Sequence, residues 1–255
     1  MEDEAVMVRN MGAVVLAAGK GTRIGMKRSN KVLLPLAGKP MIMRSLSVIR
    51  RCGIAPILIV VGFQQEAVKK RLGPEYVYVD QGELLGTGHA VAQAVTHLDL
   101  EIRDILVVNG DDSAFYDPTL LQTLIERHRS RGASLSLLSV HKNHTSGFGR
   151  IIRDDSGEVS AIREETDASQ EEKAINEVNT GTYCFSVGFL REFLPKLRMN
   201  ARKGEYYLTD LVELAYESNQ KVETVPVAQE GSFIGINTRE DLAYANIQMK
   251  KRRRR

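Results

Sequence analysis

Short, uninterrupted runs of aliphatic and β-branched residues recur in the first half of the chain, each followed by a glycine-containing turn and a segment with helical spacing. The runs cover residues 13–17, 57–61, 76–80 and 105–109. A strand that is apolar at every position is buried on both faces, as happens when helices cover both sides of a parallel sheet. The pattern therefore predicts an α/β fold with a Rossmann-like, doubly wound, mostly parallel sheet, in which ligands bind at the carboxyl ends of the strands.

Helix signals lie between these runs. Pro40 and Gly53 bracket one segment with helical spacing, and Pro118 and Gly132 bracket a second, predicted over 119–131.

After about Ser139 the pattern changes. Strands are expected over 149–154, 159–164 and 177–185, with a hairpin turn at 155–157. Helices over 187–197 and 207–218, a strand over 222–227 and a last helix from Asn237 should follow. We expect this half to carry a small mixed-sheet subdomain.

Composition excludes several classes of protein. With 43% hydrophobic residues, the 255-residue chain can bury a substantial core and is not wholly disordered. The formal charge of +3 becomes −3 when the six basic residues 250–255 are left out, so no nucleic-acid partner is expected. Cys52 and Cys184 offer neither a disulfide framework nor a cysteine metal site. The acidic first residues and the absence of a long apolar stretch lead us to expect a cytoplasmic protein without stable membrane association.

A glycine-rich loop follows the first run directly. Glycines let the backbone approach a ligand and turn its N–H groups inward, which suits phosphates. The spacing GxGxxxG over 19–25 is one residue too long for the dinucleotide fingerprint, and no GxxxxGK[ST] string exists. Arg23, Lys31 and Lys39 add cations in or beyond the loop. From these residues alone, a solvated basic turn is as good an interpretation as a phosphate site.

Two carboxylates, Asp111 and Asp112, follow the run that ends at Asn109. One carboxylate at a strand's carboxyl end suits Mg²⁺, which keeps oxygen ligands from substrate phosphates. By spacing alone, an acidic turn or a helix cap is the better interpretation.

A glutamine and a glycine-rich turn precede the helical segment predicted over 89–98. The carboxamide of Gln81 can give one donor and one acceptor to a pyrimidine edge, and Gly86 permits a close approach of the backbone. Thr87 is also compatible with simple helix capping.

Together these motifs resemble the sugar-1-phosphate nucleotidyltransferases, in particular the N-acetylglucosamine-1-phosphate uridyltransferases (UDP-N-acetylglucosamine pyrophosphorylases). The likeness spans residues 13 to about 245. It rests on residues 16–23 (LAAGKGTR), 31–33, 36–40, 81, 86–90, 110–111, 147–151, 164, 179–181, 204–210 and 235–239. The resemblance implies the nucleotide-diphospho-sugar transferase fold.

The resemblance also implies roles for matching residues. The catalytic pair would be Arg23 and Lys31, and Mg²⁺ would be held by Asp111 and Asn237. The implied nucleotide-binding residues are Leu16, Ala17, Ala18, Gly19, Lys20, Gly21, Gln81, Gly86 and Thr87. The implied sugar-binding residues are Asn109, Gly149, Glu164 and Asn179. Judged alone, Glu164 would be placed on a solvated acidic face.

The implied reaction transfers a uridylyl group from UTP to N-acetylglucosamine 1-phosphate, forming UDP-N-acetylglucosamine and pyrophosphate. We expect one nucleotidyltransferase domain over 1–248, with a nucleotide-binding half at about 11–140, a sugar-binding half at about 141–236 and a closing helix over 237–248. A solvated polybasic tail over 249–255 should follow. Bifunctional members of the family also carry an acetyltransferase domain of hexapeptide repeats, which this sequence does not contain. We therefore expect no acetyl transfer, and the oligomeric state stays open.

Two alternatives remain. One is a nucleotidyltransferase for another substrate pair, such as dTTP or GTP with a hexose 1-phosphate. The other is a regulatory protein that binds a nucleotide sugar without catalysis.

The sequence departs from the family pattern in two places. After Asp111 the family has a hydrophobic residue and a proline, whereas residues 112–115 here read DSAF. Before Lys31 the loop is one residue longer, and Asn30 stands where proline is usual.

Overall fold

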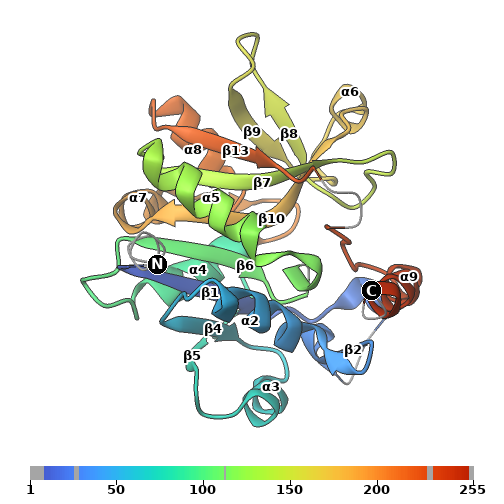
Figure 1. The fold of residues 1–255 in the computed structure, drawn as a ribbon. Coiled ribbons are helices and arrows are strands. Elements are labelled where there is room, and N and C mark those ends of the chain that lie inside the picture. Colours follow the sequence, from blue (N-terminus) through green and yellow to red (C-terminus); the bar gives the residue numbers. More distant parts are fainter. Residues whose placement is uncertain (1–8, 26–28, 112, 229–231, 253–255) are drawn as a thin grey trace.

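The computed structural model describes residues 9–25, 29–111, 113–228 and 232–252. Four strands from the first half form the parallel part of a single large sheet (Figure 1). These are β1 (Met11–Ala17), β4 (Ile57–Val61), β5 (Val77–Asp80) and β6 (Asp104–Asn109). Strand β1 lies between β4 and β6 and β5 extends the edge beyond β4, with every pairing parallel. The predicted doubly wound sheet is confirmed.

The second half adds strands to the same sheet. They are β7 (Leu135–His141), β10 (Glu177–Ser186) and β13 (Val222–Pro226), in the overall order β13-β7-β10-β6-β1-β4-β5. Strand β10 is antiparallel to both β6 and β7, and β13 is parallel to β7. The hairpin of β8 (Arg150–Arg153) and β9 (Val159–Arg163) attaches through β10. The mixed part expected in the second half therefore continues the central sheet.

Helices cover both faces of the sheet (Figure 1). On one face lie α2 (Met41–Arg51), α3 (Gln65–Leu72) and α5 (Pro118–Ser130), and on the other α4 (Thr87–Val95), α7 (Val187–Phe193) and α8 (Asp210–Glu217). Successive residues of a strand face opposite sides. Ala13 and Val15 accordingly pack with the first group, whereas Val14 packs with the second. This two-sided burial explains why the runs are apolar throughout.

Short elements complete the fold. They are η1 (Thr22–Ile24), η2 (Lys31–Leu33), β2 (Pro35–Leu36), β3 (Lys39–Pro40), η3 (Ser113–Phe115), α6 (Gln170–Lys173), η4 (Leu194–Lys196), β11 (Met199–Asn200) and β12 (Glu205–Tyr206). The α-helix expected over 187–197 ends at Phe193 and continues as η4. Pro195 explains the change, because proline cannot donate an α-helical hydrogen bond. The helix expected from residue 207 begins at Asp210.

The last helix, α9 (Arg239–Arg252), packs on a third apolar cluster beside η1 and η3. It extends past residue 248, where the closing helix was expected to end. Met249 is buried, and the Arg252 guanidinium donates to the carbonyl oxygen of Phe115, 5.6 Å from that residue's ring centroid. The beginning of the expected basic tail is thus an ordered part of the fold, and residues 253–255 lie outside the described residues. Within the described segments, no helix combines the length and apolarity needed to cross a membrane.

Candidate active site

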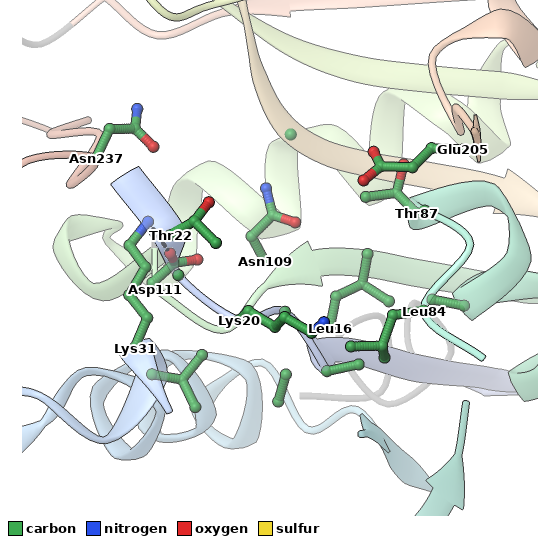
Figure 2. A pocket seen from close by; sticks show the side chains of 18 of the residues that line it. Leu16, Lys20, Thr22, Lys31, Leu84, Thr87, Asn109, Asp111, Glu205 and Asn237 are labelled. Carbon is green, nitrogen blue, oxygen red and sulfur yellow. Dashed lines mark ion pairs between the residues drawn. The ribbon is translucent and has the colours of Figure 1, made fainter. Parts of the chain in front are cut away.

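A cavity of about 560 Å³ opens at the carboxyl ends of β1 and β6 (Figure 2). The sequence-predicted residues that line it are Leu16, Ala17, Ala18, Gly19, Lys20, Gly21, Lys31, Gln81, Gly86, Thr87, Asn109, Asp111, Gly149, Glu164, Asn179 and Asn237. The fold therefore brings together nearly the whole predicted set. The backbone of Arg23 belongs to η1, but its side chain lies outside what the structure describes. Lys39 is exposed in β3 and does not line the cavity.

The glycine-rich loop approaches the turn that carries Lys31. Gly21 has φ of 60°, in the left-handed region. A Cβ atom at this position would lie 2.8 Å from the Cβ of Lys31. Both the backbone conformation and the close approach thus require glycine here.

Lys31 and Asp111 form an ion pair at one end of the cavity. Only 14% of the lysine side chain and 13% of the aspartate side chain are exposed. Asp111 directly follows Gly110, whose N–H donates to the Leu16 carbonyl oxygen over 3.0 Å. The end of β1 thereby fixes the start of the turn that carries the carboxylate. The departure at Asp112 lies outside the described residues, while the following three residues form η3 and are buried.

Asn30 occupies the position where the family pattern has proline. Its φ is −70°, which is within the range that proline imposes. The backbone can therefore follow the same path with either residue. Lys31 reaches the cavity despite the longer loop before it. Residues 26–28 of that loop lie outside the described part of the chain.

Asn237 lines the cavity near the Lys31–Asp111 pair (Figure 2). Asp241, in the first turn of α9, holds the backbone here: its Oδ2 accepts from the N–H groups of Asn237 and Thr238, each over 2.8 Å. Thr238 in turn accepts from the N–H of Asp241 over 3.1 Å. This reciprocal capping fixes the start of α9 and the backbone of Asn237.

The donor chemistry at this end fits a hard cation. Asp111 supplies carboxylate oxygens and Asn237 an amide oxygen, and a cationic group, the Lys31 ammonium, already lies against the carboxylate. Among the described residues no group of three His, Cys, Asp or Glu side chains could hold a metal. A cation here would need further oxygens from a ligand, as Mg²⁺ does when it binds phosphates.

The opposite end of the cavity is formed around Gln81, which is 5% exposed. Its Nε2 donates to the Gly86 carbonyl oxygen over 2.9 Å and lies 3.4 Å from Nδ1 of His89. The Thr87 hydroxyl accepts from the N–H of Leu208 over 3.0 Å and makes no capping bond at the start of α4. The simple capping interpretation of Thr87 is therefore wrong, because the hydroxyl joins α4 to the segment before α8.

Strand β12 packs directly on this turn. A Cβ at Gly86, whose φ is 96°, would lie 2.6 Å from the Tyr206 carbonyl oxygen. The preceding residue, Glu205, lines the cavity beside Thr87 (Figure 2). Sequence reasoning did not assign Glu205 to the site, although it falls within the matching segment 204–210.

Of the predicted sugar-binding residues, Asn109 lies on β6 and Asn179 on β10, whereas Gly149 and Glu164 flank the open end of the β8–β9 hairpin. Glu164 Oε1 accepts from the Thr209 hydroxyl over 3.0 Å. The Asn179 amide donates to the Tyr183 hydroxyl over 2.6 Å and accepts from the N–H of Gly181 over 3.0 Å. A Cβ at Gly181 would lie 2.3 Å from Asn109 Nδ2, so glycine leaves the space that this amide occupies.

An ion pair between buried Arg150 and partly exposed Glu165 holds the segment before β8. Arg150 is 2% exposed, pairs with Glu165 over 2.8 Å and donates to the Phe148 carbonyl oxygen. Glu165 also accepts from the N–H of Gly147 over 3.2 Å. The segment that brings Phe148 and Gly149 to the cavity is thus held by charge-assisted hydrogen bonds.

The carboxyl group of Asp210 is a charged neighbour of Glu164. Burial, together with the neighbouring carboxylates of Glu213 and Glu164, raises the pKa of Asp210 to about 6, although Arg163 opposes the shift. Burial also raises the pKa of the Tyr183 phenol, so that it stays protonated beside Asn179.

Several further residues line the cavity that the sequence did not assign: Thr22, Ile24, Asn30, Val32, Leu84, Ala90, Gly147, Phe148, Thr180, Gly181 and Glu205. Many of them adjoin an assigned residue, so proximity in sequence was an available signal. Leu84 lies between two assigned positions and closes the apolar side of the cavity near Leu16 (Figure 2).

A glycine-rich loop, a lysine–aspartate pair and several amide side chains lining a cavity at the carboxyl edge of a parallel sheet suit the handling of phosphate esters. The class of protein that this fold and site define is the nucleotidyltransferases. Residues 13–208 match the model of the MobA-like NTP transferase domain, and the chain belongs to that family. Enzymes of this family generally use a divalent metal.

Curated relatives at about 40% sequence identity confirm the resemblance inferred from the motifs. The bifunctional protein GlmU of Exiguobacterium sibiricum is 41% identical over 243 residues, covering 95% of this chain and 54% of the relative. The bifunctional protein GlmU of Enterococcus faecalis is 40% identical over 245 residues, covering 96% and 53%. The chain thus spans about half the length of these curated relatives.

A solved structure confirms the fold. It belongs to a Bacillus anthracis protein described as a glucose-1-phosphate thymidylyltransferase and crystallised with a sucrose. The TM-score is 0.77 over 93% of this chain and 94% of the other, at 21% sequence identity. At this identity the similarity supports the nucleotide-diphospho-sugar transferase fold alone.

Proposed function

We propose that the protein transfers a uridylyl group from UTP to N-acetylglucosamine 1-phosphate, releasing pyrophosphate and forming UDP-N-acetylglucosamine. The observation that carries this proposal is the convergence of the glycine-rich loop, the Lys31–Asp111 pair and Gln81 in one cavity. Similarity to two GlmU proteins favours this substrate pair over others.

In the proposed reaction, a phosphate oxygen of the sugar phosphate attacks the α-phosphorus of UTP. The new P–O bond forms as the bond to the β-phosphate oxygen breaks, and pyrophosphate leaves with the electron pair. No protein nucleophile is required, because a phosphate monoester is already anionic near neutral pH. The protein's contribution is to align the two substrates and to stabilise the charge that builds on the phosphoryl oxygens.

Different residues of this chain would carry out these roles. The N–H groups of the loop at 19–21 would bind the triphosphate, and Lys31, with Arg23, would neutralise phosphoryl oxygens. Asp111 and Asn237 would hold Mg²⁺, which when bound lowers the repulsion between the anionic substrates.

Different parts of the cavity would bind the uracil base and the sugar. Gln81, whose amide is oriented by its bond to Gly86, would bind uracil, with the backbone at Gly86 and Thr87 completing the base site. Gly149, Glu164, Asn179 and Asn109 would contact the sugar. A single domain over residues 1–248 would contain both parts.

Pyrophosphate release tests the proposal. UTP, dTTP, CTP, GTP and ATP are each combined with N-acetylglucosamine 1-phosphate, glucosamine 1-phosphate or glucose 1-phosphate, with and without Mg²⁺. We expect release from UTP with N-acetylglucosamine 1-phosphate that depends on the metal. A different preferred pair would overturn the substrates and keep the reaction class. Binding of UTP without release from any pair would favour a regulatory protein.

A further inference from the structure

The side chain of Asn30 makes three hydrogen bonds to the backbone. The residue is fully buried. Its Nδ2 donates to the carbonyl oxygens of Ala17 and Phe63, each over 2.8 Å, and its Oδ1 accepts from the N–H of Val32 over 3.1 Å. One side chain thus satisfies two carbonyl groups and caps the first turn of η2.

The three partners belong to different segments that meet at the cavity. Ala17 ends β1 and begins the glycine-rich loop, and Phe63 lies just beyond the end of β4. The N–H of Phe63 also donates to the Ala18 carbonyl oxygen over 3.0 Å. The Asn30 amide therefore connects the ends of two parallel strands at the edge where ligands bind in such sheets.

The third bond fixes the backbone position of Lys31. Lys31 is the first residue of η2, and the Oδ1 bond to Val32 fixes this turn from one side. From the other side the backbone at Gly21 comes so close that an added Cβ would lie 2.8 Å from the Cβ of Lys31. The lysine backbone is thereby fixed against the loop, and its ammonium pairs with Asp111.

We propose that Asn30 is a positioning residue, which holds the Lys31 ammonium against Asp111 and beside the glycine-rich loop. This inference rests on the proposed function where it concerns catalysis. A carboxamide suits the task because it offers two donors and an acceptor on one short side chain. Serine retains an acceptor for the cap but cannot bridge both carbonyl groups, and alanine makes none of the three bonds.

The first test compares N30S and N30A with S136A in the pyrophosphate assay. Ser136 is a matched control, because it is fully buried and its hydroxyl lies 2.9 Å from Nδ1 of His128, with neither residue lining the cavity. We expect both Asn30 variants to lose about 10- to 100-fold in kcat, the order that a displaced catalytic group costs. KM for the nucleotide should change much less. S136A should keep the kcat of the original protein at temperatures where it is folded.

A double-mutant cycle separates positioning from a general loss of structure. If Asn30 acts through Lys31, adding N30S to K31M should lower kcat no further than K31M alone. Independent effects that multiply would overturn the proposal, as would an N30A protein with the original kcat.

A second measurement does not depend on activity. The coupling between Lys31 and Asp111 is obtained from urea unfolding of K31M, D111N and the double variant, with Asn30 present and again in the N30S background. We expect a favourable coupling that falls in the N30S background. Equal coupling in both backgrounds would overturn the inference. Absence of pyrophosphate release from the original protein would instead overturn the proposed function, while this cycle still decides the role of Asn30.

Discussion

The ammonium of Lys31 pairs with the carboxylate of Asp111, although the two residues belong to turns that follow different strands. The pair lies at the same end of the cavity as Asn237, whereas Thr87 and Glu205 lie at the other (Figure 2). The ion pair thus lies where phosphate transfer is proposed, and the rest of the cavity is available for the base and the sugar.

Replacing either member of the pair should reduce turnover strongly. K31M removes the cation proposed to stabilise phosphoryl oxygens, and D111N removes a charge from the proposed metal site. We expect each to lower kcat about 10²- to 10³-fold, the order seen when one preorganised electrostatic group is lost. Steady-state pyrophosphate release measures the effect. K39A is the control, because Lys39 is exposed away from the cavity, and a K31M protein no slower than K39A would contradict the assignment.

Gly86→Ala should damage the base end of the cavity. The added Cβ would lie 2.6 Å from the Tyr206 carbonyl oxygen at a residue with φ of 96°. We expect a loss of stability of at least about 1 kcal/mol, because a left-handed backbone and a rigid neighbour both oppose the methyl group. The affinity for UTP, measured by calorimetry, should fall as β12 is displaced.

Gly188→Ala provides the matched control for that substitution. Gly188 lies within α7 with no atom within 4 Å of the added Cβ. Alanine there should stabilise the protein by about 0.5–1 kcal/mol through its better helix propensity, without a change in UTP affinity. If the two variants unfolded at the same urea concentration, the packing of β12 on Gly86 would be misassigned.

Much of the parallel sheet could be predicted, because strands buried on both faces leave continuous apolar runs. Strand β7 was not predicted, because Ser136 and Ser139 interrupt its run of apolar residues. Both serines are nevertheless buried. The hydroxyl of Ser139 donates to Glu177 over 2.7 Å, and that of Ser136 is paired with His128. Such partners come from other elements and leave no local signal in the sequence.

The candidate site shows a similar division. Its residues were assigned through the family resemblance, because spacing alone left the glycine-rich loop, Asp111 and Glu164 with structural interpretations that were as good or better. The bridging bonds of Asn30 and the approach of Glu205 depend on how distant segments fold together, so spacing could not reveal them. Pro195 is the opposite case, since its effect on the helix expected over 187–197 was readable from the sequence.

Asp241→Ala should weaken the proposed metal end without touching a substrate. The variant removes the carboxylate that accepts from the N–H groups of Asn237 and Thr238. We expect α9 to lose about 1 kcal/mol of capping energy and the half-saturating Mg²⁺ concentration for activity to rise several-fold. E240A, at an exposed neighbour in the same turn, should leave the Mg²⁺ requirement unchanged. The same Mg²⁺ requirement in D241A would show that the cap does not position Asn237.

The raised pKa of Asp210 predicts a specific pH dependence of stability. The folded protein holds the proton up to about pH 6, whereas an unfolded aspartate releases it near its usual pKa of about 3.9. Between these two values the folded state binds more protons, so this group's contribution to stability falls as the pH rises through the window and is constant above it. The physical cause is burial of the carboxylate beside Glu213 and Glu164.

Urea unfolding of D210N between pH 4 and pH 8 checks this dependence. The amide cannot ionise, so D210N should gain stability relative to the original protein as the pH rises from 4 to 6.5, and the difference should then level off. Glu217→Gln, an exposed site at the other end of α8, controls for the loss of a negative charge from this helix. A difference between D210N and the original protein that stays constant from pH 4 to pH 8 would mean that Asp210 is ionised throughout, and that burial does not govern its protonation.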